Sequence, residues 1–177
     1  MFIDHMGVIL FPDVVFLRMI GRIAFPLFAY QMGTGYLHTK SFKHYLLRVL
    51  FFGIFTQAFY FIGIAYFGFD LPYEKYNIFF TLALGLAAVY CFDKKKYEYI
   101  ILILILPLLV SQLGIELDYG AYGVLLILVL FMFRGSNLHL FWSMLLLNAA
   151  FYIITQDTIQ MLSLLSFVFI AKPLSVR

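Results

Sequence analysis

Two pairs of ionisable residues near the start of the chain lie inside apolar sequence, where charged side chains are costly. Asp4 and His5 are adjacent, and Arg18 and Arg22 are spaced so that both lie on one face of a helix. A neutral imidazole is the usual general base near neutral pH, and a nearby carboxylate or cation sets its tautomer and its pKa. These residue types therefore predict acid–base chemistry.

The two pairs are expected at a similar depth, counted from the outer ends of their helices. At about 1.5 Å per residue, Asp4 and His5 lie roughly 10 Å below one outer end, and the arginines lie roughly 6 and 12 Å below the other. A structural ion pair between Asp4 and Arg22 is the alternative interpretation. We expect a functional site, because an acid, an imidazole and two guanidinium groups at one depth exceed what helix packing requires.

Further polar residues fall near the same outer level. Asn77, Thr81 and Gly85 follow one another at intervals of four, which predicts a polar stripe on one helix face. The alternative for this stripe is helix packing through small residues. Asp118 precedes the sixth expected helix, where an N-cap is the simplest role. The candidate substrate- or cofactor-binding residues are Arg18, Asn77, Thr81, Asp118 and Tyr119.

The composition sets the class of protein that must position these residues. Of 177 residues, 64% are hydrophobic and only 12% are charged, which is too little polar surface for a soluble domain of this size. The basic residues fall in short loops between apolar runs, so the net charge of +3 does not indicate a nucleic-acid partner. A single cysteine permits no internal disulfide, and no spacing typical of a metal site is present.

The apolar runs predict an all-α polytopic transmembrane bundle of about eight helices, with residues 1–177 forming one integral membrane domain. The first run has only 11 residues, or about 16 Å as a helix, against a hydrocarbon core of about 30 Å. We therefore expect the natural chain to start upstream of Met1; a true half-helix is the alternative. The expected segments are Met1–Phe11, Val14–Tyr36, Tyr45–Phe69, Ile78–Phe92, Tyr99–Leu113, Tyr119–Phe133, Leu138–Ile154 and Ile159–Ala171.

The lysine and arginine residues predict an orientation in the membrane. Nine of the 12 lie on alternate connections or at the end of the chain, while the other connections carry Lys75 and most of the acidic residues. By the positive-inside rule, the first set faces the cytoplasm and the C-terminus is cytoplasmic, so we expect a multi-pass protein of the inner (cytoplasmic) membrane. The nine residues are Lys40, Lys43, Arg48, Lys94, Lys95, Lys96, Arg134, Lys172 and Arg177.

Several of these stretches resemble the TraX family. The matching motifs run in order along the chain: residues 3–7 (IDHMG), 20–30 (IGRIAFPLFAY), 35–39 (GYLHT), 43–48 (KHYLLR), 77–85 (NIFFTLALG) and 118–124 (DYGAYGV). TraX proteins are multi-helix membrane proteins named for the conjugative pilin acetylase, which acetylates the pilin amino terminus. They are similar to a wider class of membrane acyltransferases that use acyl-CoA.

The resemblance implies acyl transfer from acetyl-CoA or another acyl-CoA, without a metal, to an unidentified protein or glycan acceptor. His5 is then the expected base or transient acyl carrier, Asp4 orients it, and Arg22, assisted by Arg18, stabilises the oxyanion or the donor phosphates. Two other classes remain open. One is a small transporter that uses the buried cluster as a relay, and the other is a non-catalytic membrane assembly protein.

Overall fold

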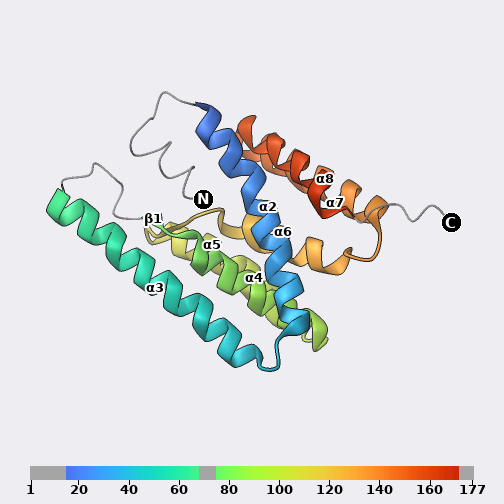
Figure 1. Cartoon of the computed structure of the whole chain (residues 1–177), viewed down its shortest axis with the longest axis horizontal. Coiled ribbons are helices and arrows are strands. Elements are labelled where there is room, and N and C mark those ends of the chain that lie inside the picture. Colours follow the sequence, from blue (N-terminus) through green and yellow to red (C-terminus); the bar gives the residue numbers. More distant parts are fainter. Residues whose placement is uncertain (1–14, 68–74, 172–177) are drawn as a thin grey trace. The chain divides into compact units, whose positions relative to one another are not determined.

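The computed structural model describes residues 15–67 and 75–171, and these residues are almost entirely helical (Figure 1). The expected segment Met1–Phe11 lies outside the described residues, so the expectation that the natural chain starts upstream of Met1 stays a prediction. The elements, in chain order, are α2 (Val15–His38), α3 (Phe42–Phe67), β1 (Lys75–Tyr76), α4 (Ile78–Asp93), α5 (Tyr97–Gln112), β2 (Glu116–Leu117), α6 (Gly120–Met132), α7 (Asn137–Thr155), the 3₁₀-helix η1 (Ile159–Ser166) and α8 (Phe167–Ile170).

The all-α helical bundle is confirmed, and its surface is typical of a membrane protein. Two described helices are long and apolar enough to cross a membrane, over Phe42–Tyr66 and Asn137–Thr155. Large apolar side chains are exposed on α3 and α5, for example Phe51, Phe59 and Leu108. Exposed apolar surface on this scale is unusual in a soluble monomer. A count of about eight spans stays a prediction.

Contacts divide the chain into two compact units. Residues Met1–Gln31 with Val129–Arg177 form one, here called the terminal unit, and Met32–Leu128 form the other, the central unit. Two helices, α2 and α6, contribute residues to both. The expectation of a single integral membrane domain stays a prediction.

The central unit has a core of aliphatic side chains from α4 and α6. Leu86 and Val89 on α4 and Val124 and Ile127 on α6 are fully buried. The two helices approach closely at Gly85, where a Cβ atom would lie 2.2 Å from Ile127 Cδ1. A side chain cannot be accommodated there without displacing Ile127. Gly85 therefore serves helix packing through a small residue.

The two ends of the central unit are each tied by contacts between distant loops. At one end, β1 pairs in parallel with β2, with Lys75 opposite Glu116 and Tyr76 opposite Leu117. At the other end, Tyr36 donates a hydrogen bond to Asp93. These are the pairs of connections that the charge pattern predicts on a common side. The strands themselves were not expected, because two residues are too few to show a strand periodicity.

In the terminal unit, the expectation of one helix over Ile159–Ala171 is wrong. The structure has a 3₁₀-helix, η1, followed by the single turn α8. Gln160, Ser163 and Ser166 recur at intervals of three, and all are at most 1% exposed. A helix with three residues per turn places residues at this spacing on one face. The 3₁₀ conformation thus places the three buried polar side chains in one row, whereas an α-helix would spread them over about 120° of its surface.

Candidate functional site

An ion pair in the terminal unit joins Arg22 of α2 to Asp157. The guanidinium Nη2 lies 3.5 Å from the carboxylate Oδ2, and the two side chains are 19% and 29% exposed. Asp157 lies in the turn between α7 and η1. A partly buried guanidinium beside a carboxylate is held in one orientation and keeps its charge, since arginine does not deprotonate in proteins. Such a group can stabilise a negative charge that develops on a substrate.

The turn fixes the position of the Asp157 carboxylate. Helix α7 ends at Thr155, and its C-cap Gln156 adopts a left-handed conformation (φ 58°) and donates its backbone N–H to the carbonyl of Tyr152. Asp157 Oδ1 then accepts from the backbone N–H of Ile159 at 3.0 Å, and the Asp157 N–H donates to Thr155 Oγ1 at 3.3 Å. One carboxylate oxygen of Asp157 therefore accepts a hydrogen bond from the first residue of η1, while the other lies next to Arg22.

A second polar contact joins α7 to η1 further along α7. Asn148 Oδ1 accepts a hydrogen bond from Ser163 Oγ at 2.7 Å, and Asn148 Nδ2 donates to the carbonyl of Met144 at 2.9 Å. Both side chains are at most 1% exposed. Asn148 lies seven residues before Thr155, which is roughly 10 Å along the helix. The terminal unit thus carries polar groups both at its α7–η1 turn and deeper between these elements.

Only part of the expected catalytic cluster lies within the described residues. Asp4 and His5 precede them, so the expected contacts of these two residues with Arg22 stay predictions. Arg18 lies on α2, one turn before Arg22, as its spacing predicts. Asp157 is an acidic partner of Arg22 among the described residues, and it lies on one of the connections that the charge pattern predicts on the outer side.

Asn77 is held in a hydrogen-bond network at the strand end of the central unit. Its Oδ1 accepts from the backbone N–H of Phe79 and caps α4, as sequence rules allow for asparagine. Its Nδ2 group lies within hydrogen-bonding distance of the Gly53 carbonyl, at 2.8 Å, and of Gln57 Oε1, at 3.0 Å. Gln57 Nε2 also donates to the carbonyl of Lys75. The network fixes the start of α4 against α3.

Thr81, Asp118 and Tyr119 lie at the same end of the central unit. Thr81 is fully buried, and its hydroxyl donates to the backbone carbonyl of Asp118. The Asp118 N–H donates to Tyr76, which continues the strand pairing. Tyr119 has a positive φ of 62° immediately before α6. The structure therefore brings Asn77, Thr81 and Asp118 to one end of this unit, and a substrate-binding role for them stays a prediction.

The described residues contain no group of three or more His, Cys, Asp or Glu that could hold a metal ion. Sequence reasoning missed Asp157 because the charges of short loops were used only for orientation. Asp157 could have been found from its position directly after α7, because this end of α7 is expected on the outer side, the side near which Arg22 is also expected. It also missed Gln160 and Ser163, whose spacing of three was hidden in an apolar run.

Comparison with known proteins places these features in a family. "Probable fimbrial assembly protein FimC, serogroup H1" of Dichelobacter nodosus is 32% identical to the chain over 139 residues, or 73% of the chain. The match covers 56% of that protein, so the chain spans about half the length of this curated relative. No solved structure matches the chain. The family model described as "TraX protein" matches residues 1–177, and the chain therefore belongs to the TraX family.

Proposed function

We propose that this chain is a membrane acyltransferase that moves an acetyl or other acyl group from acyl-CoA to an amine or hydroxyl of an exported acceptor. The observation that carries the proposal is the Arg22–Asp157 ion pair, which places a partly buried guanidinium in the terminal unit. Membership of the TraX family supports the reaction class. The fimbrial assembly name of the relative supports a pilin amino terminus as the acceptor.

The proposed reaction assigns one step to each group. His5 takes a proton from the acceptor amine or hydroxyl as that group attacks the thioester carbonyl of the donor, and Asp4 orients the imidazole. Arg22, held by Asp157 and assisted by Arg18, stabilises the negative charge on the carbonyl oxygen. The tetrahedral intermediate then collapses, the carbon–sulfur bond breaks, and the CoA thiolate takes the proton from His5. The products are the acylated acceptor and free CoA.

The proposed setting is the inner membrane, with the C-terminus in the cytoplasm. Acyl-CoA is cytosolic, whereas an exported acceptor is presented at the outer side, so the two substrates approach from opposite faces. The partition of lysine and arginine supports this orientation. We expect no metal and no nucleic acid to take part.

A non-catalytic assembly role is the second candidate, because the relative is named for fimbrial assembly. Purified protein in lipid nanodiscs, incubated with radiolabelled acetyl-CoA and a pilin amino-terminal peptide, separates the two. The acyltransferase proposal predicts label on the peptide amino group and free CoA in equal amounts. A folded protein that transfers no label to amines or hydroxyls, yet binds the peptide, is the result that the assembly role predicts.

A further inference from the structure

Two connections of the central unit are locked together by aromatic rings. Residues 39–41 link α2 to α3, and residues 94–96 link α4 to α5. Phe42 stacks on Tyr90 with ring centroids 4.0 Å apart, and Tyr36 meets both rings edge-on. The Tyr36 hydroxyl donates to Asp93 Oδ2 at 2.9 Å. These contacts fix the two connections side by side at one end of the unit.

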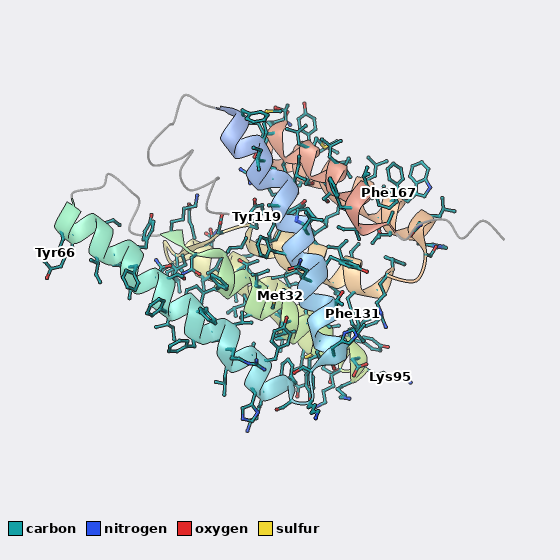
Figure 2. All side chains as sticks on the ribbon, viewed as in Figure 1. Met32, Tyr66, Lys95, Tyr119, Phe131 and Phe167 are labelled. Carbon is teal, nitrogen blue, oxygen red and sulfur yellow. The ribbon has the colours of Figure 1, made fainter. Side chains whose placement is uncertain are left out.

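The joined connections carry a concentrated positive charge, here called the basic junction. All of the lysines in this junction are exposed. One of them, Lys95 in the turn between α4 and α5, lies at the opposite end of the central unit from Tyr66 (Figure 2). Lys94 Nζ lies 3.1 Å from Asp93 Oδ2 and so neutralises the acid in the turn. The basic junction consists of Lys40, Lys43, Lys94, Lys95 and Lys96.

The strand end of the central unit, in the part of the chain that the structure describes, carries mixed charge instead. At the strand end, the exposed cation Lys75 lies opposite Glu116 in the strand pair, and Asp118 follows directly. The unit is therefore polarised, with lysines at one end and mixed charge at the other. Lys40, Lys95 and Lys96 lie on the two connections, Lys43 lies in the first turn of α3, and Lys94 is paired with Asp93. The four ammonium groups other than that of Lys94 repel one another in the absence of an anion. A compact anion with several charges is the ligand that relieves this repulsion best.

We propose that the basic junction binds the phosphate groups of the acyl-CoA donor, namely its 3′-phosphate and its pyrophosphate. The inference rests on the proposed function, which requires a donor that carries these groups. Ammonium groups bind phosphate as mobile point charges and adapt to several phosphate positions. The aromatic lock supplies the rigidity that the lysine side chains lack. The junction thereby recognises the nucleotide end of the donor and leaves the acyl end for the reaction.

The test measures CoA binding by isothermal titration with the full chain in nanodiscs of uncharged lipid. The variant Lys40→Gln/Lys43→Gln/Lys95→Gln is compared with Lys75→Gln, a matched control at the other end of the unit. The triple variant is expected to raise the Kd for CoA roughly tenfold, from three partly solvated charge contacts. The control keeps the wild-type Kd. Dephospho-CoA, which lacks the 3′-phosphate, is expected to bind the wild type more weakly than CoA does. Its affinity should fall less than that of CoA in the triple variant, and added salt should weaken CoA binding.

An unchanged Kd for CoA in the triple variant overturns the proposal. The proposal is also overturned if the junction binds phospholipid instead. In that case nanodiscs with anionic lipid raise the thermal stability of the wild type but not of the triple variant, and added CoA does not reduce this effect of the lipid. Failure of the proposed function looks different, because CoA then binds through the junction and no acyl group reaches an acceptor. Conversely, if the triple variant transfers acyl groups with an unchanged KM for acetyl-CoA, the proposed function holds but the basic junction is not the donor site.

Discussion

Arg22 lies 3.5 Å from the Asp157 carboxylate, and this residue-scale contact connects the prediction from the sequence to the structure. The sequence identified Arg22 from its place in an apolar segment, because a charge there needs a partner. It expected that partner on the preceding segment. The structure adds Asp157, at 3.5 Å, from a turn more than 130 residues away in the chain. A contact between residues so distant in the chain depends on how the terminal unit folds, which a single sequence does not reveal.

The Asp157→Asn variant isolates the charge of this residue from its structural role. The amide oxygen still accepts from the Ile159 N–H, so the start of η1 is retained, while the ion pair with Arg22 is lost. We expect a small fall in stability, about 1 kcal/mol or less for a partly exposed pair. Acyl transfer is expected to fall at least about tenfold in kcat, because a misplaced guanidinium stabilises the oxyanion less well.

Melting temperature and transfer rate are measured on the same preparations, with Asp157→Ala as the comparison that also removes the contact to Ile159. Asp157→Ala is expected to lower the melting temperature further. If Asp157→Asn leaves kcat unchanged while it lowers stability, Asp157 holds α7 and η1 in place and has no positioning role.

At the scale of elements, long apolar segments were predictable and short or polar ones were not. Helices α3 to α7 follow from runs of apolar residues between charged connections. The 3₁₀-helix η1 was not predicted, because the interval of three between Gln160, Ser163 and Ser166 also fits one side of an α-helix. The β1–β2 pair was not predicted, because two-residue strands have no recognisable sequence pattern and their pairing depends on which loops come together in the fold. At Gly85 the structure agrees with the alternative given for the polar stripe, helix packing through a small residue.

The close contact of α4 with α6 predicts the effect of Gly85→Ala. The new Cβ would lie 2.2 Å from Ile127 Cδ1, so Ile127 or the helices must move. We expect a loss of about 1–3 kcal/mol of stability, as for other over-packed cores. The double variant Gly85→Ala/Ile127→Val removes the Cδ1 atom and should recover part of that loss.

Thermal unfolding in detergent measures the effect, with Gly135→Ala as the matched control. Among the described residues, none beyond the chain neighbours of Gly135 has an atom within 4 Å of where an added Cβ would lie, so this control should leave the melting temperature unchanged. A Gly85→Ala protein as stable as the wild type would mean that α4 and α6 are further apart than described.

At the scale of the molecule, the charge pattern and the central unit agree on which connections share a side. The strand pair joins the connections that carry Glu116 and Lys75, and the aromatic lock joins those that carry the basic junction. The positive-inside rule predicts that the lysine-rich end is cytoplasmic. The apolar exposed surface of α3 and α5 is then the surface that contacts lipid.

Cysteine labelling in intact cells tests this orientation. In a Cys91→Ala background, which removes the single native cysteine, Glu116→Cys and Lys95→Cys each place one thiol at an exposed position. A membrane-impermeant maleimide is expected to modify the cysteine at position 116 and to spare the one at 95 until the membrane is permeabilised. Labelling of position 95 alone in intact cells would reverse the orientation and place the basic junction outside.

Acyl transfer by the His5→Ala variant is the most direct test of the central claim, that this TraX-family chain catalyses the reaction with an acid–base group beside Arg22. The assay uses labelled acetyl-CoA and the pilin peptide, and circular dichroism and thermal unfolding check the fold. His5→Ala is expected to lower the rate at least about 100-fold while the protein stays folded, because a general base is lost. Asp4→Asn should lose activity in part, and Arg22→Lys should lose most of it, because an ammonium group cannot replace a planar guanidinium. Full transfer activity in a folded His5→Ala protein would contradict the account.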